Sequence, residues 1–182
     1  IVPGKAGAPT LARATVERSL RGAAGPGAEV TVFVGGPRAD DPKRPLEPWF
    51  TATTPADVGG RYVLFLRTSR AGSGWTLEGL FSADGDEGAE KLAVLEEEMR
   101  LAADADPARR RERTVAYLVG LVEAERPWSR LHGARELAWI AGAVPGALGE
   151  ETLQAIEERR TRSFEGGVRA ALAAALDRVE PG

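Results

Sequence analysis

The sequence predicts an α+β protein in which five strands precede about five helices. Up to residue 82, apolar residues recur with a period of two, which is typical of strands. From residue 85 the period lengthens to about 3.6, which is typical of amphipathic helices. Because a run of strands followed by a run of helices usually forms two layers or subdomains, we expect domains at 1–83 and 88–180. The polar stretch 82–88 is the predicted flexible connector between them.

The strands are predicted from alternation and from the turns between them. In 11–20, Ala12, Ala14 and Val16 alternate with polar residues, and the glycines and proline of 22–27 indicate a turn. The run 62–66 is apolar throughout, which predicts a central strand covered on both faces. The five predicted strands are 1–2, 11–20, 28–35, 59–67 and 74–81.

A proline-rich segment separates the third and fourth predicted strands. Residues 36–60 contain five prolines, which exclude a central strand and predict a long irregular loop. Loops of this length are commonly functional or mobile, and Trp49 and Phe50 lie in the middle of this one. We expect these two aromatic residues either to anchor a protein partner or to fold back and cap the sheet.

The second half is predicted to be helical throughout. Asp106 followed by Pro107 is a preferred helix start, since Asp accepts bonds from the first turn and Pro fits the first helical position. The apolar stripes place Trp139 in the helical core. The predicted helices are 90–105, 106–125, 126–143, 149–161 and 166–179.

Two helical stretches carry a resemblance to a repeat family. The segment "VRAALAAAL" (168–176) resembles the second helix of a HEAT-type repeat, and "ARELAWIAG" (134–142) resembles the corresponding helix of the preceding repeat, with 114–123 as its first-helix partner. Their spacing of about 34 residues is in the range of helical-hairpin repeats. Gly166 and Gly167 replace the aspartate that the family places before its valine-arginine pair. The resemblance implies a short HEAT-like array that binds partners on an extended surface.

The first half resembles another family. "TVERSLRGAAGPGAEVTVFV" followed by "VGGRYVLFLR" is similar to the netrin-like or metalloproteinase-inhibitor-like domains of bacterial exported proteins. The resemblance implies a five-stranded OB-like β-barrel over 1–83. The inhibitor family proper places an N-terminal cysteine on zinc. This chain has no cysteine, so that mechanism is not carried over.

Composition excludes several classes of function. The formal charge of -3 argues against a nucleic-acid partner, and no apolar run reaches the length of about 20 residues that a membrane span needs. Without cysteine there is neither a disulfide nor a thiolate nucleophile. The richness in Ala, Gly and Arg favours a bacterial source, and we expect a mature periplasmic or secreted protein whose signal peptide has been removed.

No catalytic signature is present. His132 is the only histidine, which excludes a Ser-His-Asp triad and paired-histidine metal sites, and we interpret it as a surface or helix-packing residue. The acidic stretch 84–87 imitates part of a calcium loop but lacks the rest of its frame. Glycine-rich phosphate-binding motifs and the GxSxG motif are absent from the sequence. We therefore expect no catalytic residue, cofactor or metal.

The two basic runs supply the remaining candidates for partner binding. They place five arginines where stacked helices would share one groove, or where neighbouring acids would pair with them on a solvated face. The candidates are Arg109, Arg110, Arg113, Arg159 and Arg160.

The sequence therefore predicts a non-enzymatic protein that binds or scaffolds a protein partner. Two alternatives stay open. One is an inhibitor or accessory domain of an enzyme, acting through the loop 36–60. The other is binding of single-stranded nucleic acid by the barrel, which needs basic and aromatic residues together on the sheet.

Overall fold

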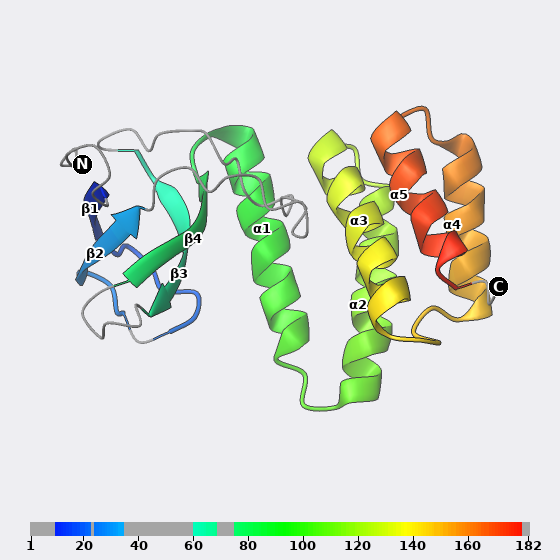
Figure 1. Cartoon of the computed structure of the whole chain (residues 1–182), viewed down its shortest axis with the longest axis horizontal. Coiled ribbons are helices and arrows are strands. Elements are labelled where there is room, and N and C mark those ends of the chain that lie inside the picture. Colours follow the sequence, from blue (N-terminus) through cyan, green and yellow to red (C-terminus); the bar gives the residue numbers. More distant parts are fainter. Residues whose placement is uncertain (1–9, 23, 35–59, 69–74, 180–182) are drawn as a thin grey trace. The chain divides into compact units, whose positions relative to one another are not determined.

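A computed structural model describes residues 10–22, 24–34, 60–68 and 75–179, which form four strands followed by five helices (Figure 1). The α+β class is confirmed. The chain divides into two compact units, Ile1–Leu92 and Ala93–Gly182. The elements are β1 (Thr10–Thr15), β2 (Glu29–Val34), β3 (Tyr62–Thr68), β4 (Trp75–Ser82), α1 (Gly85–Ala102), α2 (Pro107–Val122), α3 (Pro127–Ala143), α4 (Glu150–Arg162) and α5 (Gly166–Asp177).

The strands form two antiparallel hairpins joined into one sheet of order β1-β2-β4-β3. A short parallel pairing of Val32 with Trp75 and of Phe33 with Thr76 joins the hairpins. The predicted turn between β1 and β2 is present, with Gly22 and Gly27 at φ of 115° and 81°. Glycine reaches these angles without the steric cost that other residues meet. Val30, Val32 and Phe81 form the buried apolar part of the sheet.

The predicted barrel is the main correction in this unit. In the part of the chain that the structure describes, the sheet is open and has four strands. The run 62–66 lies in β3, at an edge of this sheet, because β4 pairs with both β3 and β2 and takes the central place. The predicted strand 1–2 and the loop 36–60, with Trp49 and Phe50, lie outside the described residues.

The predicted flexible connector 82–88 is corrected, because Ser82 ends β4, residues 85–88 form the first turn of α1, and only residues 83–84 lie between them. The backbone N–H of Arg61 donates to the Asp84 carboxylate at 3.1 Å, and the N–H of Asp84 donates to the Ser82 hydroxyl at 3.2 Å. A Cβ added to Gly88 would lie 2.5 Å from the Ser82 carbonyl oxygen. The glycine is therefore required by close packing of the first turn of α1, whereas the sequence pattern indicated a loop.

Helices α2 to α5 form two hairpins packed together (Figure 1). Helix α2 pairs with α3 and α4 with α5, while α3 also packs on α5 and α2 on α4. The predicted start of α2 is confirmed, because the Asp106 side chain accepts bonds from the N–H groups of Ala108 and Arg109. None of the described helices is both long and apolar enough to cross a membrane. The largest fully buried side chains of this unit are Leu118, Leu137, Ile156, Leu172, His132 and Val168.

Polar contacts also connect the two hairpins. Arg130 of α3 forms an ion pair with Glu165, the residue that precedes α5, and also donates to the Ala124 carbonyl at 2.7 Å. Arg178 donates to the Ala138 carbonyl of α3 at 2.5 Å. These contacts, together with the apolar core, hold the two hairpins against each other.

Candidate functional site

Trp139 on α3 is exposed, which corrects its predicted place in the core. Its side chain is 62% exposed, although tryptophan is on average a well-buried residue. The buried side of α3 is formed by the stripe that contains Leu137, Ala138 and Ala141. Trp139 lies on the opposite stripe, four residues after the exposed Arg135. Its exposure therefore follows from helical geometry and indicates a surface role.

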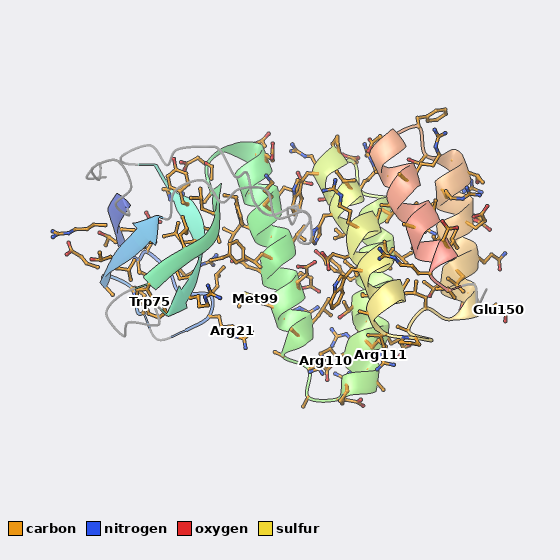
Figure 2. The ribbon with its side chains drawn as sticks, viewed as in Figure 1. Arg21, Trp75, Met99, Arg110, Arg111 and Glu150 are labelled. Atoms are coloured by element: carbon orange, nitrogen blue, oxygen red, sulfur yellow. The ribbon has the colours of Figure 1, made fainter. Side chains whose placement is uncertain are left out.

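A groove of about 330 Å³ lies beside Trp139. It is bounded by the end of α1, the start of α2 and the end of α3, all within the unit Ala93–Gly182. Arg110 and Arg111, which are labelled in Figure 2, lie at the start of α2 and line the groove. The lining residues are Glu98, Ala102, Pro107, Arg110, Arg111, Thr114, Leu118, Glu136, Trp139, Ile140, Val144 and Ala147.

A second, more open hollow lies on the other side of Trp139. Its lining consists of Trp139, Gly142, Ala143 and Arg178. Arg178 lies over Gly142, since a Cβ added there would be 3.1 Å from the Arg178 Cδ. Trp139 is thus a ridge between two hollows, and each hollow carries an arginine.

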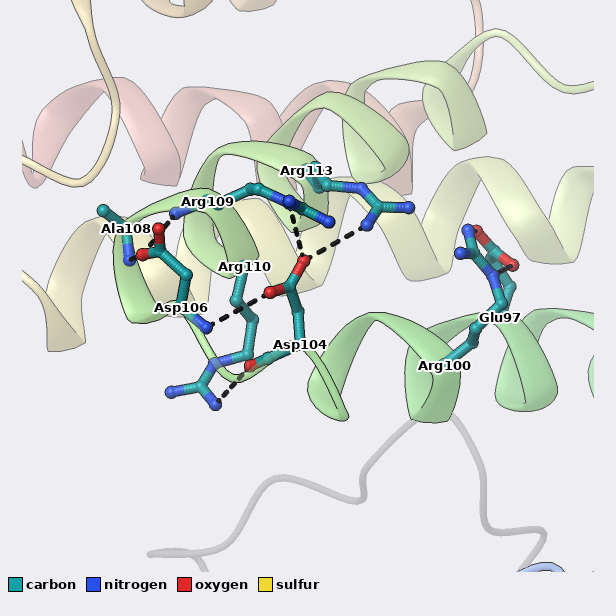
Figure 3. Close-up of polar contacts among 8 residues, drawn as sticks. All are labelled: Glu97, Arg100, Asp104, Asp106, Ala108, Arg109, Arg110 and Arg113. Carbon is teal, nitrogen blue, oxygen red and sulfur yellow. Dashed lines mark hydrogen bonds and ion pairs between the residues drawn. The ribbon is translucent and has the colours of Figure 1, made fainter.

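Asp104, in the turn between α1 and α2, gathers the first predicted basic cluster (Figure 3). Its carboxylate binds Arg109 Nε at 3.0 Å and an Arg113 guanidinium nitrogen at 3.2 Å, and its carbonyl accepts from Arg110 at 3.2 Å. The backbone N–H of Asp106 also donates to the carboxylate at 3.2 Å. This hydrogen bond is the main reason that the pKa of Asp104 is lowered, and the two arginines lower it further. The partner of Arg109 and Arg113 is thus Asp104, which lies before the basic run and outside the helix that carries it.

The second predicted basic cluster lies elsewhere. Arg159 binds Glu123, the residue that caps the C-terminus of α2, at 2.6 Å, and Arg160 binds Glu157 at 2.6 Å. The first cluster is at the N-terminus of α2, about 24 Å away along the 16 residues of this helix. Of the five predicted arginines, only Arg110 lines the groove, so the two clusters do not share it. Their role in partner binding stays a prediction.

Arg111 was missed by the sequence reasoning. It is exposed, lines the groove, and has no polar partner among the residues that the structure describes. The sequence signal was available, because Arg111 lies in the same basic run as the predicted arginines.

His132 is a buried helix-packing residue, which confirms the second of its two interpretations. Its Nε2 lies 2.7 Å from Glu98 Oε1 across the contact between α1 and α3. The Trp128 ring stacks on the imidazole with a centroid distance of 5.0 Å and an angle of 6°. The imidazole is fully buried and holds one of the groove's two carboxylates in place.

The described residues include no group of three or more His, Asp or Glu side chains suited to holding a metal ion. The groove instead combines apolar side chains, an exposed indole, two guanidinium groups and two carboxylates. Such a set recognises a surface through burial, stacking and bidentate hydrogen bonds. Comparisons with protein-family models, with curated proteins and with solved structures found no match.

Proposed function

We propose that the chain is a non-enzymatic binding or scaffolding protein whose helical unit holds a protein partner at the Trp139 groove. The observation that carries this proposal is the exposure of Trp139 beside a hollow lined by apolar and arginine side chains. Tryptophan and arginine are the residues most enriched among those that dominate the energy of protein interfaces. Covering Trp139 with a partner would remove from water an apolar surface that folding leaves exposed.

The packing of the helices supports this proposal. The second helices of the two hairpins, α3 and α5, pack on each other and begin 39 residues apart, at Pro127 and Gly166. The first helices, α2 and α4, pack on each other as well. This is the arrangement expected of HEAT-like repeats, and such arrays bind proteins along the surface that their stacking leaves open.

The test compares two exposed aromatic residues. Phe164, between α4 and α5, is 101% exposed and lies outside both hollows, so it is the matched control for Trp139. We expect Trp139→Ala and Phe164→Ala to unfold at nearly the same temperature as the wild type, because surface substitutions usually change stability by less than about 0.5 kcal/mol.

The readout is the quantitative recovery of bound proteins from extracts of the native host, with each variant as bait. We expect Trp139→Ala to lose, by about tenfold or more, proteins that Phe164→Ala retains. Equal recovery with both variants would refute the proposal. A large loss of thermal stability in Trp139→Ala, but not in Phe164→Ala, would show that Trp139 stabilises the fold by packing.

A further inference from the structure

We infer that the segment held at the Trp139 groove is acidic, with an apolar residue next to its carboxylates. This inference rests on the proposed function and adds the chemistry of the partner. It follows from one guanidinium group of the groove, that of Arg111, which has no polar partner within the described residues.

The two carboxylates of the groove are already engaged. Glu98 binds the buried His132 at 2.7 Å, and Glu136 also takes part in an interaction within the chain. Arg111, in contrast, has no polar partner in the described part of the chain. Among the charged side chains of the groove, Arg111 is thus the one that has no polar partner within the described residues.

Further guanidinium groups surround Trp139. Arg110 donates one N–H to the Asp104 carbonyl, and Arg178 donates one to the Ala138 carbonyl. Since a guanidinium carries five N–H donors, both keep donors for another acceptor. Arg135, one turn before Trp139 on the exposed stripe, resembles Arg111 in having no partner within the described ranges. Arginines thus flank the indole on both sides.

The apolar floor defines the other half of the ligand. Ala102, Leu118 and Ile140 contribute apolar side chains to the lining of the groove. Binding there removes apolar surface from water, while planar guanidinium groups accept carboxylates in bidentate geometry. A nucleic acid fits less well, because its backbone brings a continuous run of phosphates to a chain whose formal charge is -3, whereas a short acidic segment brings only a few carboxylates.

A selection from a displayed library of random linear peptides tests the inference, with the intact chain as target. We expect the enriched peptides to combine Asp or Glu with a large apolar residue. Their synthetic versions should bind Arg111→Glu at least about tenfold more weakly than the wild type, because the reversed charge repels the carboxylates. Arg169→Glu, on the exposed face of α5 and outside both hollows, is the matched charge control and should bind within about twofold of the wild type.

The possible results separate this inference from the proposed function. Neutral or basic peptides that depend on Trp139 but not on Arg111 would overturn the acidic partner and leave the proposed function standing. A selection that yields no peptide dependent on Trp139 would overturn both. Oligo-dT that binds more tightly than the selected peptides, and needs both Trp139 and Arg111, would overturn the inference in favour of a nucleic acid. For an acidic peptide, raising NaCl from about 50 to about 500 mM should weaken binding, since salt screens exposed charges.

Discussion

Gly133 brings α3 close to the backbone of α2, and a single methyl group there tests the packing of the hairpin. A Cβ added to Gly133 would lie 2.7 Å from the Leu118 carbonyl oxygen and 2.8 Å from the Leu121 Cβ. Because one of these atoms belongs to the backbone, no rotamer change relieves the contact and the helices must move apart. Overpacking of this kind costs about 1–3 kcal/mol.

Gly120 on α2 provides the matched control for the same substitution. It is exposed, and a Cβ there meets no atom within 4 Å. Replacing a helical glycine by alanine gains up to about 1 kcal/mol from helix propensity in either position. The difference between Gly133→Ala and Gly120→Ala therefore isolates the packing cost, which we expect to be about 1–3 kcal/mol.

Urea unfolding followed by far-UV circular dichroism measures both free energies. We expect the urea midpoint of Gly120→Ala to lie above that of the wild type. The midpoint of Gly133→Ala should lie clearly below that of Gly120→Ala, and the dependence of the unfolding free energy on urea concentration should be the same in both. Equal midpoints for the two variants would refute the close approach of α2 and α3 and, with it, the geometry that places Trp139 on the outer stripe.

Three further predictions concern charge and close packing. Folding lowers the pKa of Asp104, so its carboxylate stabilises the fold at pH values above the usual pKa of aspartate, and this stabilisation is lost on acidification. The urea midpoints of the wild type and Asp104→Asn should therefore differ above about pH 5 and converge as the pH falls below it. Burial first, and then the charges of Glu98 and Glu97, raise the pKa of Tyr117 to about 12. In a Tyr62→Phe background, tyrosinate absorbance should therefore appear near pH 12, and stability should fall above about pH 10, because the unfolded chain releases this proton first. Gly88→Ala should lower the thermal midpoint, since its Cβ would meet the Ser82 carbonyl at 2.5 Å, and an unchanged midpoint would contradict the tight turn.

The helices of the second half were predictable because their start signals are local. The predicted helices 106–125 and 126–143 agree with α2 and α3 to within a few residues, since Asp106, Pro107 and Pro127 mark the starts. The start of α1 was missed because Gly85 and Gly88 indicate a loop in sequence, whereas the structure uses them for a turn and a close contact. Local sequence patterns thus identify the periodicity of a helix. They do not show that a glycine is needed because another part of the backbone packs closely against it.

The order of the strands could not be predicted from local patterns. The parallel contact of β2 with β4 joins residues more than 40 positions apart, and no alternation of side chains encodes such a pairing. The apolar run of β3 indicated a central strand, yet the sheet places β4 at that position. A continuous apolar run shows that both faces are partly covered, which is a weaker statement than a position in the sheet.

The groove was missed for a different reason. Trp139 was assigned to the apolar side of its helix, although its helical position groups it with the exposed Arg135. Because residues four apart lie on the same face of a helix, the position of Trp139 relative to Arg135 predicts its exposure. The ion pairs of Asp104 with Arg109 and Arg113 could not be predicted from helical spacing. Asp104 lies outside helix α2, in the turn before it, and its carboxylate folds back onto that helix.

The enclosed position of α3 determines how rigid the proposed binding surface is. This helix is held by Glu98 from the end of α1, by α2 along its length and by α5 on the next hairpin. Its amide protons should therefore exchange with solvent more slowly than those of α4, which packs less extensively on its two neighbouring helices. The indole that we propose as the anchor thus projects from a helix that packs extensively within its unit, so little backbone entropy is lost when a partner covers it.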